Sequence, residues 1–219
     1  MYRKDLLITG HTYHIFNRGV NKATIFYSED DYRRFYETAI HYLNKRVKYS
    51  SSQTFSDTVS LDSADTVSEE NDKVEVLAYC LMPNHFHFLV KQIADGGITD
   101  YFRHLLNAYS HYVNIKYKRI GPLFQGPFRN LLVETDEQLV HLSRYIHLNP
   151  LVAGLVADAR NYMWSSYMAC LGEKKNGLCD GKIIKGYFKS AREYEKFVLD
   201  QADYARELER IKHLTVDYA

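Results

Sequence analysis

The sequence is poor in cysteine and has no long apolar run, and both shortages narrow the classes of protein that it can encode. Cys80, Cys170 and Cys179 are odd in number, far apart and without Cys-x-x-Cys spacing. This pattern favours a reducing compartment and argues against a structural zinc site. The chain shows neither a charged-then-apolar leader nor an apolar segment of membrane length. We therefore expect a cytoplasmic protein with no membrane partner.

An excess of charge of one sign is also lacking. The 219 residues include 28 Lys and Arg against 27 Asp and Glu, a formal net charge of +1. This balance neither requires nor excludes a nucleic acid, because the clustering of charges decides phosphate binding. Basic residues do gather in the turn with Arg18 and Lys22 and in the run 116–119. Nineteen tyrosines offer rings that can stack on unpaired bases, although tyrosine is also an ordinary half-buried core residue.

The periodicity of apolar residues predicts alternating strands and helices. The expected strands are 11–17, 74–81, 85–91 and 130–134. The expected helices run from a Ser28 cap to about residue 46, from a Thr99 cap to about 118, and from a Thr135 and Gln138 capping box to a stop at Pro150. This order matches the split β-α-β arrangement. We therefore predict a ferredoxin-like α+β fold with a central antiparallel sheet and a third helix added C-terminal to it.

Two segments differ in composition from this domain. Residues 49–72 are dominated by Ser, Thr, Asp and Glu, and such a segment buries too little apolar surface to offset its ordering entropy. We predict a flexible surface insertion there. The organisation expected is a domain over 1–170 and a helical tail over 171–219, with a helix at about 191–211. The apolar stripe of that helix fits packing on the parent domain, a homodimer contact or a DNA-binding appendage.

Two histidines flank one apolar residue in a predicted strand. His85 and His87 are two apart, so their side chains leave the same face and can converge on one ion, while Phe86 and Phe88 enter the core. Taken alone, the pair favours two solvated histidines on a polar strand face, because a bare His-x-His is a weak signal.

Tyr145 and Asn149 lie four apart near the end of the third predicted helix, so they share a face one turn from each other. Taken with that helix alone, both have structural interpretations. Asn before Pro150 is an ordinary helix stop, and a lone tyrosine is usually a packing residue.

Four separated motifs, taken together, resemble those of the single-tyrosine HUH transposases. The similarity is greatest to REP-associated tyrosine transposases, which are relatives of the insertion-sequence-200 type. The resemblance covers residues 8–170. Its motifs are LMPNHFH at 81–87, GPLFQG at 121–126, RYIHLNPLVAGLV at 144–156 and WSSY at 164–167.

The resemblance implies roles for particular residues. His85 and His87 match the metal ligands, Tyr145 matches the nucleophile, and Asn149 matches the position that completes the metal shell. Some relatives have Gln at that last position, whereas this chain has the shorter Asn. Two imidazoles and an amide oxygen suit Mn²⁺, and Mg²⁺ if waters fill the remaining positions.

The reaction implied is metal-dependent cleavage and rejoining of single-stranded DNA beside a hairpin, through a 5′-phosphotyrosine intermediate. Candidates for contacts with the DNA backbone are Arg18, Lys116, Lys118, Arg119, Arg129 and Arg144. One alternative is a hairpin-binding regulator of repeat elements that no longer transposes. A second is a replication or conjugative nickase, although those usually carry further domains. A generic two-histidine hydrolase would not explain Tyr145 and Asn149.

Overall fold

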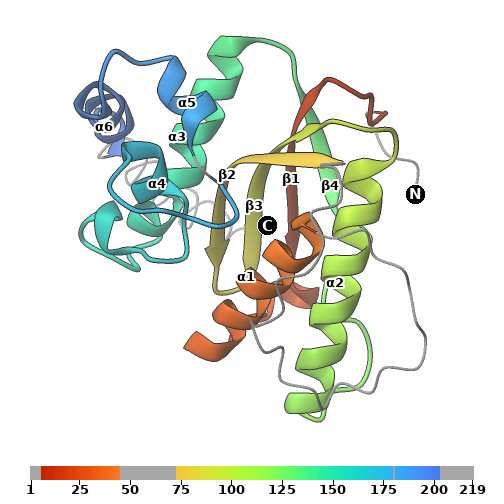
Figure 1. The fold of residues 1–219 in the computed structure, drawn as a ribbon. Coiled ribbons are helices and arrows are strands. Elements are labelled where there is room, and N and C mark those ends of the chain that lie inside the picture. Colours follow the sequence, from red (N-terminus) through yellow and green to blue (C-terminus); the bar gives the residue numbers. More distant parts are fainter. Residues whose placement is uncertain (1–5, 45–72, 180, 203–219) are drawn as a thin grey trace, which may run out of the picture.

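The computed structural model describes residues 6–44, 73–179 and 181–202, and its centre is a four-stranded sheet (Figure 1). The strands are β1 (Thr12–Arg18), β2 (Val74–Met82), β3 (His85–Gln92) and β4 (Arg129–Val133). Their spatial order is β2-β3-β1-β4, and every neighbouring pair is antiparallel. The central strands β1 and β3 are not joined by a direct turn, because a helix and β2 lie between them in the chain. This is the split β-α-β topology, so the predicted fold class is confirmed.

Helices cover both faces of the sheet (Figure 1). One face carries α1 (Glu29–Asn44) and α2 (Gly97–Lys116), and the other carries α3 (Asp136–Val152), α4 (Tyr167–Leu171), α5 (Lys182–Gly186) and α6 (Ala191–Leu199). Two short 3-10 helices are η1 (Val20–Lys22) and η2 (Ala159–Asn161). None of the helices in the described ranges combines the length and apolar character needed to cross a membrane.

Strand alternation divides the apolar side chains between two cores. Ile15 and Phe86 point toward α1 and α2, whereas Cys80 and Leu89 point toward α3. Burial on both faces explains why β2 reads as a nearly continuous apolar run and not as an alternating one.

Two predicted helix boundaries were wrong. The second helix begins at Gly97 and not after Thr99, because Gly96 takes the left-handed conformation (φ 72°) and turns the chain there. Pro150 does not stop the third helix, which continues to Val152. A proline so near the end removes only one helical hydrogen bond, and the buried Leu148 and Leu151 hold the last turn against the sheet.

Other local predictions were confirmed or lie outside the described residues. Thr135 caps α3 by accepting a hydrogen bond from the Gln138 amide, and the Gln138 side chain accepts one from the Glu134 amide. The last helix begins at Ala191 as predicted, and α6 packs against α3 in a shared apolar cluster. The insertion at 49–72 and the predicted helix beyond residue 202 are not among the described residues.

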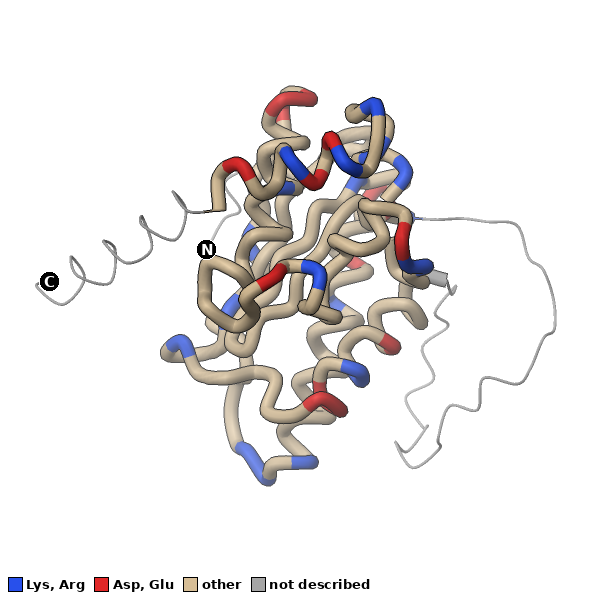
Figure 2. Tube along the Cα trace, turned by 90° about the vertical axis from the view of Figure 1, so that its left-hand side faces the viewer, with Lys and Arg blue, Asp and Glu red and all other residues tan. Residues whose placement is uncertain are grey.

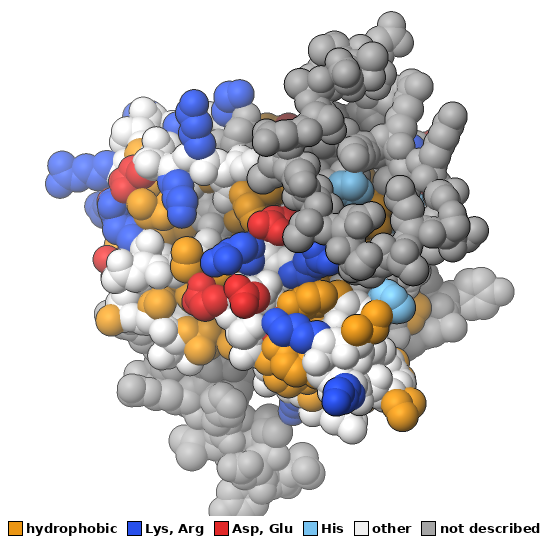
Figure 3. All heavy atoms as spheres, turned by 60° about the horizontal axis from the view of Figure 1, so that its bottom comes forward, with side chains coloured by type: hydrophobic (Ala, Val, Ile, Leu, Met, Phe, Trp, Pro, Cys, Tyr) orange, Lys and Arg blue, Asp and Glu red, His pale blue; other side chains and the backbone are white. Residues whose placement is uncertain are grey.

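Charges of both signs are interspersed over the surface. Basic and acidic segments alternate along the tube in Figure 2, and Figure 3 shows acidic side chains between basic ones at the end of the molecule where α2 finishes. Attraction for a polyanion must therefore come from a local arrangement of cations.

Candidate active site

A pocket of about 230 Å³ opens where β1 ends and where β3 and β4 begin. These strand ends meet because both neighbours of β1 run antiparallel to it. Residues from four separate stretches of sequence surround the pocket. They are Phe16, Asn17, Arg18, His85, His87, Gln125, Pro127, Arg129 and Tyr145.

The strand register explains why these side chains meet. Phe16 of β1 lies opposite His87 of β3 and opposite Arg129 of β4, and Arg18 lies opposite His85. Directly opposed residues point to the same face of a sheet. The two histidines, two arginines and one phenyl ring therefore all project toward the face on which α3 lies.

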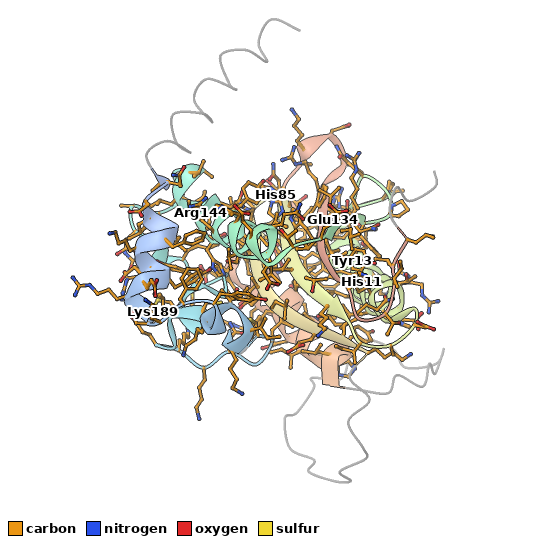
Figure 4. The ribbon with its side chains drawn as sticks, turned by 90° about the horizontal axis from the view of Figure 1, so that it is seen from above. His11, Tyr13, His85, Glu134, Arg144 and Lys189 are labelled. Carbon is orange, nitrogen blue, oxygen red and sulfur yellow. The ribbon has the colours of Figure 1, made fainter. Side chains whose placement is uncertain are left out.

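The third helix brings Tyr145 to this pocket. The Tyr145 ring lies edge-on to His87, with 5.4 Å between the ring centroids, and its centroid is 6.2 Å from that of His14. Half of Tyr145 is exposed (50%). Figure 4 shows that α3 lies across the same face of the sheet as the labelled His85 side chain. The histidine pair and the tyrosine, which are about sixty residues apart in sequence, thus share one site within one chain.

Each histidine of the pair is held through the same ring nitrogen. His85 donates from Nδ1 to the Asn84 side-chain oxygen at 2.6 Å, and His87 Nδ1 lies 2.9 Å from Nε2 of His14. Nε2 of His87 is buried and has no hydrogen-bond partner among the described residues. A proton on Nδ1 of His87 satisfies the bond to His14 and leaves a lone pair on Nε2. Metal-binding histidines are oriented in this way by their other nitrogen.

Burial keeps these imidazoles neutral. Desolvation lowers the pKa of His85 to about 4, with the Arg18 charge contributing, and lowers the pKa of His14 to about 4. The pKa of His87 falls well below its ordinary value through desolvation, with further contributions from His14, His85 and Arg18. At neutral pH a proton therefore competes weakly for the Nε2 lone pairs, which suits a divalent cation.

The donor set at this pocket fits a metal ion with an open coordination shell. Among the described residues no group of three or more His, Cys, Asp or Glu side chains is arranged around one point, so the two histidines would need an amide or water oxygen beside them. Asn149 lies one turn beyond Tyr145 as expected, but its amide donates to the Tyr145 carbonyl at 2.8 Å and does not line the pocket. Its role as a ligand stays a prediction.

The six arginines and lysines predicted to contact DNA do not lie together. Arg18 and Arg129 line the pocket. Lys116 instead bonds Asp31 at 2.7 Å. Arg144 stacks on Phe197 of α6, with 4.3 Å from its guanidinium carbon to the ring centroid. Lys118 and Arg119 follow the end of α2, outside the residues that line the pocket.

His14 is a site residue that the sequence analysis missed. Its only sequence signal is the alternation His14-x-Phe16-x-Arg18, which puts three non-aliphatic side chains on one strand face. Which face that is depends on the pairing of β1 with β3, and this pairing joins residues about seventy positions apart.

A second buried polar network anchors the helix that carries Tyr145. His147 Nδ1 lies 2.7 Å from the Tyr194 hydroxyl, and His147 Nε2 lies 2.8 Å from Ser166 Oγ. The Tyr194 hydroxyl donates to Ser143, and Ser166 accepts from the Tyr79 amide. The network thereby ties α3 to β2 and α6. Full burial lowers the pKa of His147 to about 3, so it joins these bonds as a neutral imidazole.

Comparisons with known proteins give a family for the sequence and a similar fold for the structure. A family model described as "Transposase IS200 like" matches residues 8–149. A solved structure of a REP-associated tyrosine transposase bound to a REP hairpin is similar in fold, with a TM-score of 0.57 and 14% sequence identity over 81% of this chain and 87% of that one. No curated protein matches the chain significantly.

Proposed function

The chain belongs to the IS200-like transposase family, and from this premise we propose that it cleaves and rejoins single-stranded DNA with Tyr145 as the nucleophile. The observation that carries the proposal is the position of the Tyr145 ring. Its centroid is 5.4 Å from that of the His87 ring, in a pocket that Arg18 and Arg129 also line. A phenol, two neutral imidazoles and two guanidiniums suit attack on a phosphodiester.

The reaction is an in-line displacement at phosphorus. The Tyr145 oxygen forms a bond to phosphorus, loses its proton to solvent or to a base, and the bond to the 3′-oxygen breaks. The products are a 5′-phosphotyrosine and a free 3′-hydroxyl. Because the phosphotyrosine is again a phosphodiester, a second 3′-hydroxyl can reverse the step and transfer the strand without ATP.

The charged and metal-binding groups of the pocket have separate tasks in this scheme. Arg18 and Arg129 hold the phosphates of the strand, and guanidinium groups are well suited to this by their paired N–H donors. His85 and His87 would hold Mg²⁺ or Mn²⁺, which supplies neutralisation of the charge that builds on the phosphate oxygens. Asn84 and His14 keep the two imidazoles in the required orientation.

We further propose that the DNA carries a hairpin beside the scissile segment. The solved relative is bound to such a hairpin, and attack by Tyr145 requires a flexible unpaired strand at the pocket. The proposed function is therefore that of a transposase acting at hairpin-flanked sites.

The test is covalent capture. The protein is incubated with Mn²⁺ and 3′-labelled single strands copied from both flanks of its gene, and adducts are separated on a denaturing gel. We expect an adduct with the unaltered chain and none with Tyr145→Phe, which retains binding of the uncut strand within about twofold.

The matched control is Tyr187→Phe. Tyr187 is similarly exposed (42%), lies outside the pocket and bonds Asp136 through its hydroxyl. This variant should form the adduct normally. An adduct of undiminished yield with Tyr145→Phe would place the nucleophile elsewhere and overturn the proposal.

A further inference from the structure

We propose that Phe16 is the platform on which the unpaired base next to the scissile phosphate stacks. This inference rests on the proposed function and adds a base-binding position to it. Phe16 lines the pocket together with the two histidines and Tyr145, so a base on its ring would leave the adjoining phosphate at the reacting groups.

The Phe16 ring is supported on one side by aromatic neighbours. It stacks on His14 with 5.0 Å between centroids and an interplanar angle of 30°, and its centroid is 6.1 Å from that of His87. Since His14 and His87 are themselves stacked and hydrogen bonded, they give the Phe16 ring a rigid support. A planar group that is fixed in this way loses little conformational entropy when a ligand stacks on it.

The environment of Phe16 differs from that of an ordinary core ring. Its strand neighbours Tyr13 and Ile15 are fully buried, whereas Phe16 is only partly buried. The same sheet face is open toward β4, where Leu131 lies opposite His14 and is 43% exposed. A core role alone would not leave an apolar ring at the wall of a polar pocket.

Cations flank the ring on two sides. Arg18 follows two residues later on the same strand face, and Arg129 is the direct cross-strand partner on β4. An aromatic ring between two arginines combines a stacking surface with charges that hold the phosphates before and after the base. No Asp or Glu is among the described residues that line this pocket.

The chemistry that this arrangement recognises is an unpaired nucleobase. A base in a duplex already stacks on its neighbours, whereas one in a single strand has a face to offer. Gln125 at the wall of the pocket adds an amide that can bond to a base edge. The ring selects single-stranded over duplex DNA at the cleavage position, and the amide adds a modest preference among bases.

The first experiment measures binding of fluorescent dT15 by anisotropy in chelator, so that neither metal nor cleavage enters. Phe16→Leu should weaken binding about tenfold, in line with the loss of one base–aromatic stack. Phe16→Tyr, which keeps the ring, should bind within twofold of the unaltered chain. Leu131→Ala, a change of another apolar side chain on the same sheet face, is the control and should also bind within twofold. If Phe16→Leu binds dT15 as tightly as the unaltered chain, the proposal that Phe16 stacks on a base is overturned.

The second experiment separates stacking from damage to the pocket. The same proteins are titrated with a 15-mer that has an abasic sugar at every position. Without bases, the tenfold difference between the unaltered chain and Phe16→Leu should fall to less than twofold. A difference that stays tenfold on the abasic strand means that Phe16 maintains the pocket and does not stack on a base. Because no adduct is scored, failure of covalent capture with intact dT15 discrimination would refute the proposed function alone.

Discussion

His14 shows at the residue scale how a site depends on a side chain that carries no motif. It holds His87 through a single ring nitrogen at 2.9 Å, and it is buried beneath both His87 and Phe16. Loss of such an orienting partner typically reduces metal affinity by about ten- to a hundredfold.

We therefore predict that His14→Leu weakens Mn²⁺ binding by at least about tenfold, measured by calorimetric titration at pH 7.5. The control is His104→Leu, since His104 lies on α2 outside the pocket and bonds the Asp100 carbonyl. Unchanged Mn²⁺ affinity in His14→Leu would show that His87 needs no support from β1.

A second prediction at this scale concerns charge. Arg129→Gln should lower affinity for dT15 severalfold and reduce the slope of log affinity against log salt by about 0.7, because one phosphate contact is lost. Arg33→Gln is the control, because Arg33 is an exposed arginine on α1, outside the pocket, that pairs with Asp30. Anisotropy at three salt concentrations measures both effects, and an unchanged slope for Arg129→Gln would contradict the assignment.

At the scale of elements, Asp31 joins α1 to α2. Its carboxylate is fully buried and accepts hydrogen bonds from Lys116, Tyr112 and Tyr117. Although desolvation acts to raise the pKa of Asp31, these bonds outweigh it and hold the pKa below its ordinary value. Lys116 is therefore placed to stabilise the helix pair, which differs from the backbone contact that its sequence neighbourhood suggested.

We predict that Asp31→Asn lowers the free energy of unfolding by about 2 kcal/mol, since a charged acceptor of several hydrogen bonds is lost. Lys116→Gln should destabilise less, because the lysine head is partly in solvent, and it should leave dT15 affinity within twofold. Urea unfolding and anisotropy measure the two effects. A large loss of DNA affinity with normal stability in Lys116→Gln would restore the DNA-binding interpretation.

The network around His147 acts between α3, β2 and α6. Removing the Ser166 hydroxyl leaves a buried imidazole nitrogen and the Tyr79 amide without their partner. We expect Ser166→Ala to destabilise the protein by about 2–3 kcal/mol. Ser110→Ala on α2 is a substitution of the same kind outside the network, and it should change stability by less than about 0.5 kcal/mol. Similar urea midpoints for the two variants would mean that the network contributes little.

The behaviour of the whole molecule with pH follows from its buried histidines. The folded-state pKa values of His14 and His85 are about 4 and that of His147 is about 3, all below the unfolded value of 6.5. Between these values the unfolded chain binds more protons than the folded one. The contribution of these three neutral histidines to the stability of the fold is thus complete above about pH 6.5 and is lost as the pH falls toward 4.

We therefore predict that the free energy of unfolding falls steadily from pH 7 to pH 5. His147 alone accounts for about 2 kcal/mol of the loss at pH 5. This pH lies about 1.5 units below the unfolded pKa of 6.5, and each unit corresponds to about 1.4 kcal/mol. Urea unfolding at pH 7, 6 and 5 measures the slope of the unfolding free energy against pH. His147→Gln should reduce this slope by the amount that corresponds to about one proton taken up on unfolding. A flat profile would show that these imidazoles are not held neutral by burial.

Local sequence was sufficient to predict the order of the elements and the shared strand face of His85 and His87. The order of strands and helices, the Thr135 cap and the convergence of His85 and His87 follow from periodicity, capping and two-residue spacing, which all act over a few residues. Where two local signals competed, as at Gly96 against Thr99, a boundary was misplaced by three residues.

Tertiary structure decided which side chains surround those motifs. The register of β1 against β3 and β4 brought His14, Phe16 and Arg129 to the pocket, and the packing of α1 on α2 assigned Lys116 to Asp31. Pairing between strands and burial of charges depend on contacts between residues far apart in the chain, so no local pattern contains them. The sequence supplies the side chains of the site, and strand pairing in the folded sheet determines which other side chains lie next to them.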